Sequence, residues 1–451
     1  MIRSILPVLM TSLGLTLSAG LAQADTLTDA LISAYKNSGL LVQNRAVLRA
    51  ADEDVAQALA ALRPVLSYSA SSTYASVTDN VSSSLSLSAS VLLYDFGGSR
   101  LSRDIAKENV LLAREALIGV EQDVLLRAVA AYVGVQRDTS IVSLRENNLR
   151  VITQELRAAR DRFEVGEITR TDVSSAEARL AAGKSALAAA QGNLASTREE
   201  YRVAVGAYPG AQANLPKLPE TAPSLEAAQA VARTRHPDIM RAKRNVVIAD
   251  MNVASATSAI KPSLQGTAST SINQDGDESS SVGVSLSGPI YRGGRLASVI
   301  RAAKAQADST RAALHLTQLA VDQNVANAWF DLSVANAQLQ ARDEEIRAAS
   351  VAFEGAREEA SLGARTTLDV LDAEQDLLDA RSSRITAESN RYVAIYSLLE
   401  TMGLLTADHL RLGIVQYDPT AYYNAVKNAP TYQVSPQGQK LDGVLKAIGK
   451  N

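Results

Sequence analysis

Residues 361–372 read Ser-Leu-Gly-Ala-Arg-Thr-Thr-Leu-Asp-Val-Leu-Asp, and a related stretch at residues 165–173 reads Val-Gly-Glu-Ile-Thr-Arg-Thr-Asp-Val. In each stretch a glycine precedes a threonine by three residues, and an aspartate follows that threonine by three. Glycine commonly ends a helix, and Thr-x-x-Asp has the spacing of a capping box that begins the next one. Both stretches therefore predict a helix, a short loop and a second helix.

Further landmarks recur in the same order along the two halves of the chain. Gly166 and Gly363 are 197 positions apart, and the other matching pairs of segments are 26–30 with 224–228, 62–64 with 260–262, and 94–101 with 291–296. Landmarks that stay in register indicate a tandem duplication of about 195 residues per unit. The predicted units are repeat 1 (25–220), repeat 2 (221–412) and a tail (413–451) that either wraps the middle of the molecule or lacks order.

Each unit contains a long stretch without proline, at residues 65–208 and 290–418. These stretches are rich in Ala, Leu, Arg, Glu and Gln, which favour helices. The predicted helices, beyond one that precedes each pair of strands, lie at about residues 99–163, 170–206, 295–360 and 367–402. A helix of about 65 residues is about 98 Å long. The frequent alanines suit closely packed helices, although alanine is also simply a strong helix former.

Between the helices the sequence alternates with a period of two, which predicts β-strands. Serines at positions 84, 86, 88 and 90 alternate with apolar or small residues, and the second unit alternates in the same way. The predicted hairpins span residues 64–94 and 262–291. One apolar face suits a membrane barrel, and Tyr94 and Tyr291 at the strand ends suit the membrane interface.

Four strands cannot close a membrane barrel, since the smallest have about eight. Open strand edges in lipid would leave backbone N–H and C=O groups unpaired. Several chains must therefore share one barrel. The alternative is that these hairpins remain in water as ordinary sheet edges.

Residues 1–24 have the form of a signal peptide. Arg3 precedes an apolar stretch at residues 5–17, and Ala22-Gln23-Ala24 offers the small-x-small cleavage pattern. The apolar stretch is shorter than the about 20 residues that a membrane-spanning helix needs. We therefore expect export from the cytoplasm and a mature chain that begins at Asp25.

Composition excludes several classes of function. The 451 residues carry a net charge of −3, which argues against nucleic-acid binding, and contain no cysteine, which excludes disulfides and thiol chemistry. The three histidines are far apart, at positions 236, 315 and 409. No phosphate-binding loop, catalytic triad or metal-ligand motif is visible, so we expect no enzyme activity and no cofactor.

The tandem units, the segments 94–98 and 291–294, and above all residues 361–372 resemble the TolC family of outer-membrane channel-tunnel proteins over about residues 25–410. The resemblance implies an α+β membrane protein that forms a homotrimer. Its twelve-stranded transmembrane barrel, with four strands from each chain, is continued by a long periplasmic α-helical coiled-coil tube. It also implies the outer membrane of a Gram-negative bacterium and contact with outer-membrane lipid.

Asp369 and Asp372 are candidates for the pore constriction. They are three positions apart and share a helical face, so three copies around an axis would crowd six carboxylates at one opening. The resemblance implies two such acidic rings at the periplasmic mouth. The simpler interpretation of Asp369 is a helix-start carboxylate, but the counterpart of Asp372 in repeat 1 is Ser175, so a duplicated cap does not explain Asp372.

The resemblance also implies contacts that hold the mouth closed between the inner helical hairpin and its neighbour. Transferred residue by residue, these contacts link Arg365 with Thr171 and Asp172. Arg365 faces the non-basic Ile168 in the alignment of the repeats. A family tyrosine is replaced here by Ala360, so part of the usual closure is missing or relocated.

The turns of the two stretches resemble the tips at which periplasmic adaptor proteins dock, although a bare turn would need the same glycines. The docking residues are Val165, Gly166 and Glu167 in repeat 1, and Leu362, Gly363 and Ala364 in repeat 2.

The predicted function is a passive outer-membrane exit duct of a tripartite export system for type I protein secretion, multidrug efflux or both. A periplasmic adaptor and an inner-membrane ABC or RND-type transporter would open the duct. One alternative is a non-conducting trimeric envelope scaffold or stalk. A second is a secreted hydrolase that uses the aspartate pair, which is disfavoured because no nucleophile accompanies it.

Overall fold

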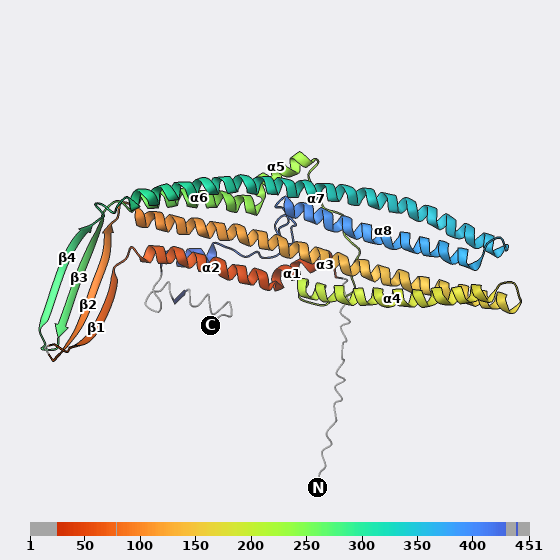
Figure 1. Ribbon diagram of the computed structural model, residues 1–451, viewed down its shortest axis with the longest axis horizontal. Coiled ribbons are helices and arrows are strands. Elements are labelled where there is room, and N and C mark those ends of the chain that lie inside the picture. The colour runs from red at the N-terminus through yellow and green to blue at the C-terminus, as the bar shows by residue number, and fades with distance from the viewer. Residues whose placement is uncertain (1–24, 78, 430–438, 441–451) are drawn as a thin grey trace, which may run out of the picture.

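The computed structural model describes residues 25–77, 79–429, 439 and 440. The expected signal peptide and about half of the expected tail, residues 430–438 and 441–451, lie outside these residues. The described chain is long and thin, with a sheet at one end, the loops between long helices at the other, and short helices near the middle (Figure 1). We call the loop ends the first tip (residues 165–169) and the second tip (residues 362–366).

Two helices run from the sheet to the tips, and each is followed by a shorter helix that returns to the middle (Figure 1). In chain order these four are α3 (Gly98–Glu164), α4 (Arg170–Val205), α7 (Arg295–Ser361) and α8 (Thr367–Thr401). Both α3 and α7 contain 67 residues, or about 100 Å of helix. Helix α8 packs against α7, against α3 and, less extensively, against α4.

The half of the molecule nearer the sheet is completed by shorter helices that precede each pair of strands. They are α1 (Leu27–Asn37) and α2 (Gly39–Ala60) in repeat 1, and α5 (Leu225–Arg235) and α6 (Pro237–Ser258) in repeat 2. Helices α2 and α6 both pack against α3, and α6 also packs against α7. The two repeats thus have the same element order and lie side by side.

The strands form one antiparallel sheet in the order β1-β2-β3-β4. The strands are β1 (Val65–Ala75), β2 (Asn80–Tyr94), β3 (Ser263–Asn273) and β4 (Glu278–Ser287). The pairing of β2 with β3 joins the two repeats, while β1 and β4 are the edges of the sheet within the described chain. Four strands per chain and two repeated units confirm the predicted fold class at this level.

The register places like residues in rows across the sheet. Ser67, Ser88, Ser269 and Ser281 are successive partners across all four strands, and Ser69, Ser86, Ser271 and Ser279 form a parallel row. The opposite face carries apolar residues such as Leu66, Leu87 and Val282, all exposed. No helix in the described part of the chain covers either face of the sheet (Figure 1).

Tyr291 does not lie at a strand end, contrary to the prediction for the second hairpin. Strand β4 ends at Ser287, four residues earlier, whereas Tyr94 is the last residue of β2. Pro289 lacks an N–H to continue the ladder. A Cβ on Gly288 would lie 2.7 Å from Pro262, so the chain turns away from the sheet in close contact with the start of β3.

The main hydrophobic core lies at the middle of the molecule. It joins α1, α3, α4 and α8 through buried side chains that include Leu125, Tyr132, Tyr201 and Leu399. The Tyr132 hydroxyl donates to the carbonyl oxygen of Asp25 at 2.8 Å, which ties the start of α1 to α3. A much smaller cluster lies near the tips and contains Ile152, Leu156, Ala176 and Leu371.

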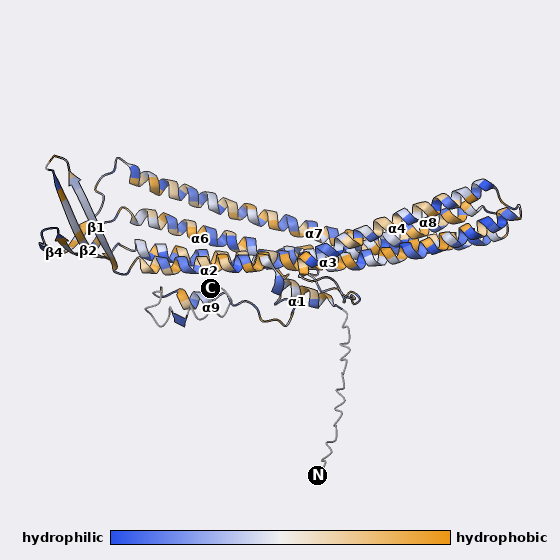
Figure 2. Cartoon of the chain, turned by 90° about the horizontal axis from the view of Figure 1, so that it is seen from below, coloured by the Kyte–Doolittle hydropathy of each residue, from blue (hydrophilic) through white to orange (hydrophobic). Residues whose placement is uncertain are grey.

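Hydrophobic and hydrophilic residues are interspersed along the full length of the helices (Figure 2). Among the described helices, none is long and apolar enough to cross a membrane.

Residues 413–429 return along the outside of α2 and include the short helix α9 (Ala421–Val426). The Tyr422 hydroxyl donates to the Glu53 carboxylate of α2 at 2.6 Å. Arg63, two residues before β1, donates to the carbonyl oxygen of Ala429 at 2.7 Å, so this part of the predicted tail lies in the half of the molecule nearer the sheet.

Candidate pore constriction and docking tips

The first and second tips have the same backbone. Gly166 has φ 80° and Gly363 has φ 78°, in the left-handed region that favours glycine. At the first tip the N–H of Glu167 donates to the carbonyl of Arg162 at 2.9 Å, and at the second the N–H of Ala364 donates to Glu359 at 2.8 Å. These bonds satisfy the last carbonyls of α3 and α7, so each long helix stops at its glycine.

Capping boxes begin both returning helices. At the start of α4, the Asp172 carboxylate accepts from the N–H of Thr169 at 2.9 Å, and the Thr169 hydroxyl oxygen accepts from the N–H of Asp172 at 3.3 Å. Thr366 and Asp369 exchange the same bonds at 2.9 and 3.2 Å at the start of α8. The capping boxes predicted from the Thr-x-x-Asp spacing are confirmed.

Asp369 is held as an ionised carboxylate at the second tip. The backbone N–H and then the hydroxyl of Thr366 donate to it, at 2.9 and 2.8 Å, and both bonds lower the pKa of Asp369. Arg365 contributes a weaker favourable charge. Helix capping and a negative charge at the second tip are therefore compatible roles for this residue, because the bonds of the cap favour the ionised carboxylate.

Asp372, one turn further along α8, has a partner that sequence reasoning missed. Its carboxylate forms an ion pair with the guanidinium of Arg179 on α4. Both side chains are partly exposed. The contact joins the two helical hairpins within one chain.

Arg365 does not meet Thr171 or Asp172 within one chain. Its guanidinium forms an ion pair with Glu359 of the same hairpin at 2.8 Å, while Asp172 is bonded to Thr169. The expected link would have to form between neighbouring chains.

The tips present apolar side chains to solvent. Val165 is 71% exposed and Leu362 is 79% exposed. A Cβ added to Gly166 or Gly363 would meet no atom within 4 Å, so the space beside each glycine is open. Two exposed apolar side chains on identical turns make a surface that a partner protein can cover.

Glu374 is a second residue that sequence reasoning missed. It is 7% exposed, and the Asn148 amide of α3 donates to its carboxyl group at 2.9 Å. Burial raises the pKa of Glu374 to about 7, the bond from Asn148 opposes that rise, and the charge of Glu155 adds to it. The two hairpins of one chain therefore meet through a buried polar bond near the start of α8.

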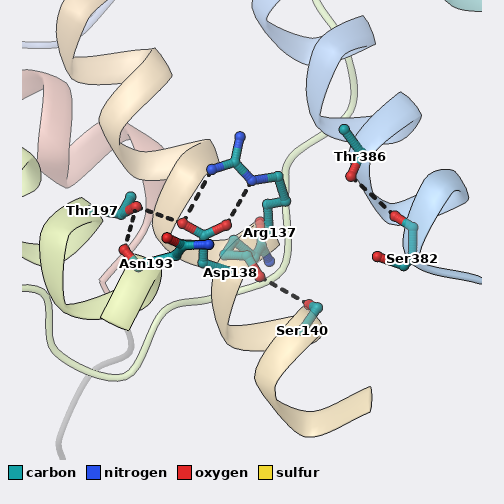
Figure 3. Close-up of polar contacts among 8 residues, drawn as sticks. Arg137, Asp138, Ser140, Asn193, Thr197, Ser382 and Thr386 are labelled. Carbon is teal, nitrogen blue, oxygen red and sulfur yellow. Dashed lines mark hydrogen bonds and ion pairs between the residues drawn. The ribbon is translucent and has the colours of Figure 1, made fainter. Parts of the chain in front are cut away.

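Midway between the sheet and the tips, a buried carboxylate joins α3 to α4. Asp138 is 5% exposed and accepts two bonds from Arg137, at 2.7 and 3.1 Å (Figure 3). The Thr197 hydroxyl is within hydrogen-bonding distance of two acceptors, the Asp138 carboxylate and the carbonyl oxygen of Asn193. This junction fixes α3 against α4 far above the first tip.

A comparison of the two repeats could have indicated Arg179 and Glu374, the residues that sequence reasoning missed. Arg179 aligns with Asp376, and Asp372 with Ser175, at a separation of 197 positions. Glu374 aligns with Glu177, which is exposed and pairs with Arg160 at 2.6 Å. Positions where the repeats differ in charge or burial mark the contact between the hairpins.

An uncovered sheet with one exposed apolar face, helices of about 100 Å and acidic side chains at the far end fit a membrane-anchored helical conduit. The family model described as outer membrane efflux protein matches residues 30–207 and 213–404. The chain therefore belongs to the outer membrane efflux protein family, and each repeat carries one match. It is an outer-membrane protein whose helical tunnel lies in the periplasm.

Named relatives agree with this assignment. The chain is 37% identical over 431 residues to outer membrane efflux protein BepC of Brucella suis, covering 92% of this chain and 93% of that one. It is 25% identical to outer membrane protein TolC of Escherichia coli, with 90% and 88% covered. The solved structure of VceC from Vibrio cholerae aligns with a TM-score of 0.70 at 22% identity over 84% of this chain and 96% of that one, which bears on the fold alone.

Proposed function

We propose that three copies of the chain assemble into one duct, whose twelve-stranded barrel lies in the outer membrane. The observation that carries this proposal is the sheet: it exposes an apolar face and two strand edges, β1 and β4, within the described chain. Lipid would favour the apolar face, but unpaired edges in lipid are costly. Pairing β1 of one copy with β4 of the next removes every edge when the ring closes.

The second tip forms the narrow end of this duct. Asp369 and Asp372 from three copies form an acidic constriction that attracts cations and narrows the periplasmic mouth. The low pKa of Asp369 supports a charge that persists at neutral pH. The duct is a passive passage, and it catalyses no reaction.

Contacts between chains hold the mouth closed. Arg365 of one copy reaches Thr171 and Asp172 of its neighbour, exchanging its bond to Glu359 for this link. The Arg365–Glu359 pair is exposed on both sides, so it is weak enough to be exchanged.

The tips receive the rest of the export machine. A periplasmic adaptor covers Val165, Gly166 and Glu167 at the first tip, and Leu362, Gly363 and Ala364 at the second. An inner-membrane transporter of the ABC or RND type supplies the energy and selects the cargo. The names of the relatives, which describe outer-membrane efflux, support this class of cargo transfer.

Two measurements on the purified full-length protein test this function. The mass in detergent should equal three chains, and the protein should conduct ions in planar lipid bilayers. A trimer that never conducts would instead indicate an envelope scaffold or stalk. A water-soluble single chain would refute the barrel, the constriction and the tips together.

Photo-crosslinkers at Val165 and Leu362, placed in cells, test the docking surface. We expect a crosslinked band that contains an adaptor. The control is a crosslinker at Val203. This residue is also exposed and lies on α4, the helix that follows the first tip, but near the end of α4 that is remote from the tip. Equal yields of the same band from all three sites would refute docking at the tips.

A further inference from the structure

The two candidate carboxylates of the constriction stand in different electrostatic surroundings. Within the described residues Asp369 forms no ion pair, and its bonds come from Thr366 of its own helix turn. Asp372 is paired with Arg179 of α4. The nearby Arg365 is paired with Glu359 and acts on Asp369 only through its charge, so of these two aspartates Asp372 alone forms an ion pair in the described part of the chain.

The Arg179–Asp372 pair also lies on the contact between the two hairpins. Leu371, next to Asp372, is buried in the small cluster formed by α3, α4 and α8. Two residues beyond, the buried Glu374 accepts the bond from Asn148 of α3. Separation of α8 from α3 and α4 would therefore break the ion pair together with this packing.

We propose that Arg179 is a specificity-determining residue of the duct: it masks the charge of Asp372 while α4 and α8 are together, and their separation unmasks it. The inference rests on the proposed acidic constriction. In the closed mouth Asp369 then supplies most of the negative charge. Opening adds one exposed carboxylate per chain, so the mouth attracts cations more strongly as it widens.

The divergence of the two repeats supports this assignment. The repeat 2 position that matches Arg179 is Asp376, and the repeat 1 position that matches Asp372 is Ser175. Neither Arg179 nor Asp372 belongs to the turn and cap that both tips share. The ion pair instead lies where the hairpin of repeat 1 contacts the hairpin of repeat 2.

Block of the channel by La³⁺ added on the periplasmic side tests the masking in planar bilayers. Arg179→Gln should lower the blocking concentration about fivefold and shift the reversal potential in a KCl gradient toward greater cation selectivity, because one carboxylate per chain is uncovered. Arg179→Lys keeps the positive charge and should behave like the unsubstituted protein.

The double variant distinguishes the masking of the Asp372 charge from a loosened contact between the two hairpins. Arg179→Gln with Asp372→Asn removes both partners, so the contact between the hairpins stays broken while the added charge disappears. Its blocking concentration should return to within about twofold of the unsubstituted protein. Asp372→Asn alone should weaken block far less than Asp369→Asn does.

Three outcomes would overturn the inference, and they differ in what else they refute. If Arg179→Gln raises conductance without changing block, Arg179 only holds the hairpins together. If Asp369→Asn weakens block but Arg179→Gln leaves it unchanged, the constriction stands and the masking fails. If block responds to none of the three acidic and basic substitutions, the constriction itself is wrong.

Discussion

At the first tip Gly166 has φ 80° and Thr169 caps α4, and at the second Gly363 has φ 78° and Thr366 caps α8 with the same set of bonds. The matched positions beyond the caps differ. Ser175 in repeat 1 aligns with Asp372 in repeat 2. Glycine and cap are thus what a helical hairpin requires, while the unmatched residues determine how the two hairpins meet.

The largest expected effect separates the two capping aspartates. Asp369→Asn should weaken block by La³⁺ at least about tenfold, because the proposed constriction would lose three carboxylates at once. Asp172→Asn is the comparison variant, since it changes the same bond in the matching cap of the first tip. Loss of its proposed link to Arg365 should raise the conductance, but it should weaken the block far less than Asp369→Asn does, and equal losses of block in the two variants would place the constriction elsewhere.

Glu374 should make the packing of α8 depend on pH. The folded-state pKa of Glu374 is raised from 4.5 to about 7, so folded chains bind more protons than unfolded ones between these values. The packing of α8 on α3 is therefore most stable below about pH 4.5 and loses up to about 3 kcal/mol as pH rises through 7.

Hydrogen exchange of α8, corrected for intrinsic rates, measures this loss. Protection around Glu374 should fall between pH 5 and 8, and Glu374→Gln should remove most of the fall. Glu177→Gln, at the exposed matched position, should leave it intact. A fall that persists in Glu374→Gln would assign the pH dependence to other groups.

A smaller effect is expected from the unmatched arginine. Arg365→Ala should raise the single-channel conductance about twofold, because the proposed link between chains is lost. Asp172→Ala should act in the same direction. Ile168→Ala, the matched position of the first tip, should change nothing, and unchanged conductance in both Arg365→Ala and Asp172→Ala would remove the link.

The smallest effect should be common to both tips. Gly166→Ala and Gly363→Ala each force a side chain into left-handed backbone at a cost of about 1 kcal/mol, with no added clash because the space is open. Thermal unfolding should show similar losses for the two variants. A markedly larger loss at one tip would mean that its turn has an additional role.

Much of the fold could be predicted because its determinants are local. The glycines, the Thr-x-x-Asp caps and the alternation of the strands act over a few residues, and duplication displays each of them twice. The contacts between the two hairpins are not local. Arg179 and Asp372 are 193 positions apart, and Asn148 and Glu374 are 226 apart. Nothing near Asn148 in the sequence indicates which face of a 67-residue helix meets α8.

The serine rows of the sheet bear on which cargo the proposed duct can release. The hydroxyl oxygens of Ser67 and Ser88 are 2.7 Å apart, and those of Ser269 and Ser281 are 2.9 Å apart. These hydroxyls therefore form hydrogen bonds to one another across the strands. A wall of such groups is wettable and electrically neutral. In the proposed duct, with these rows facing the lumen, the last stage of the cargo's path would neither filter it by charge nor retain it.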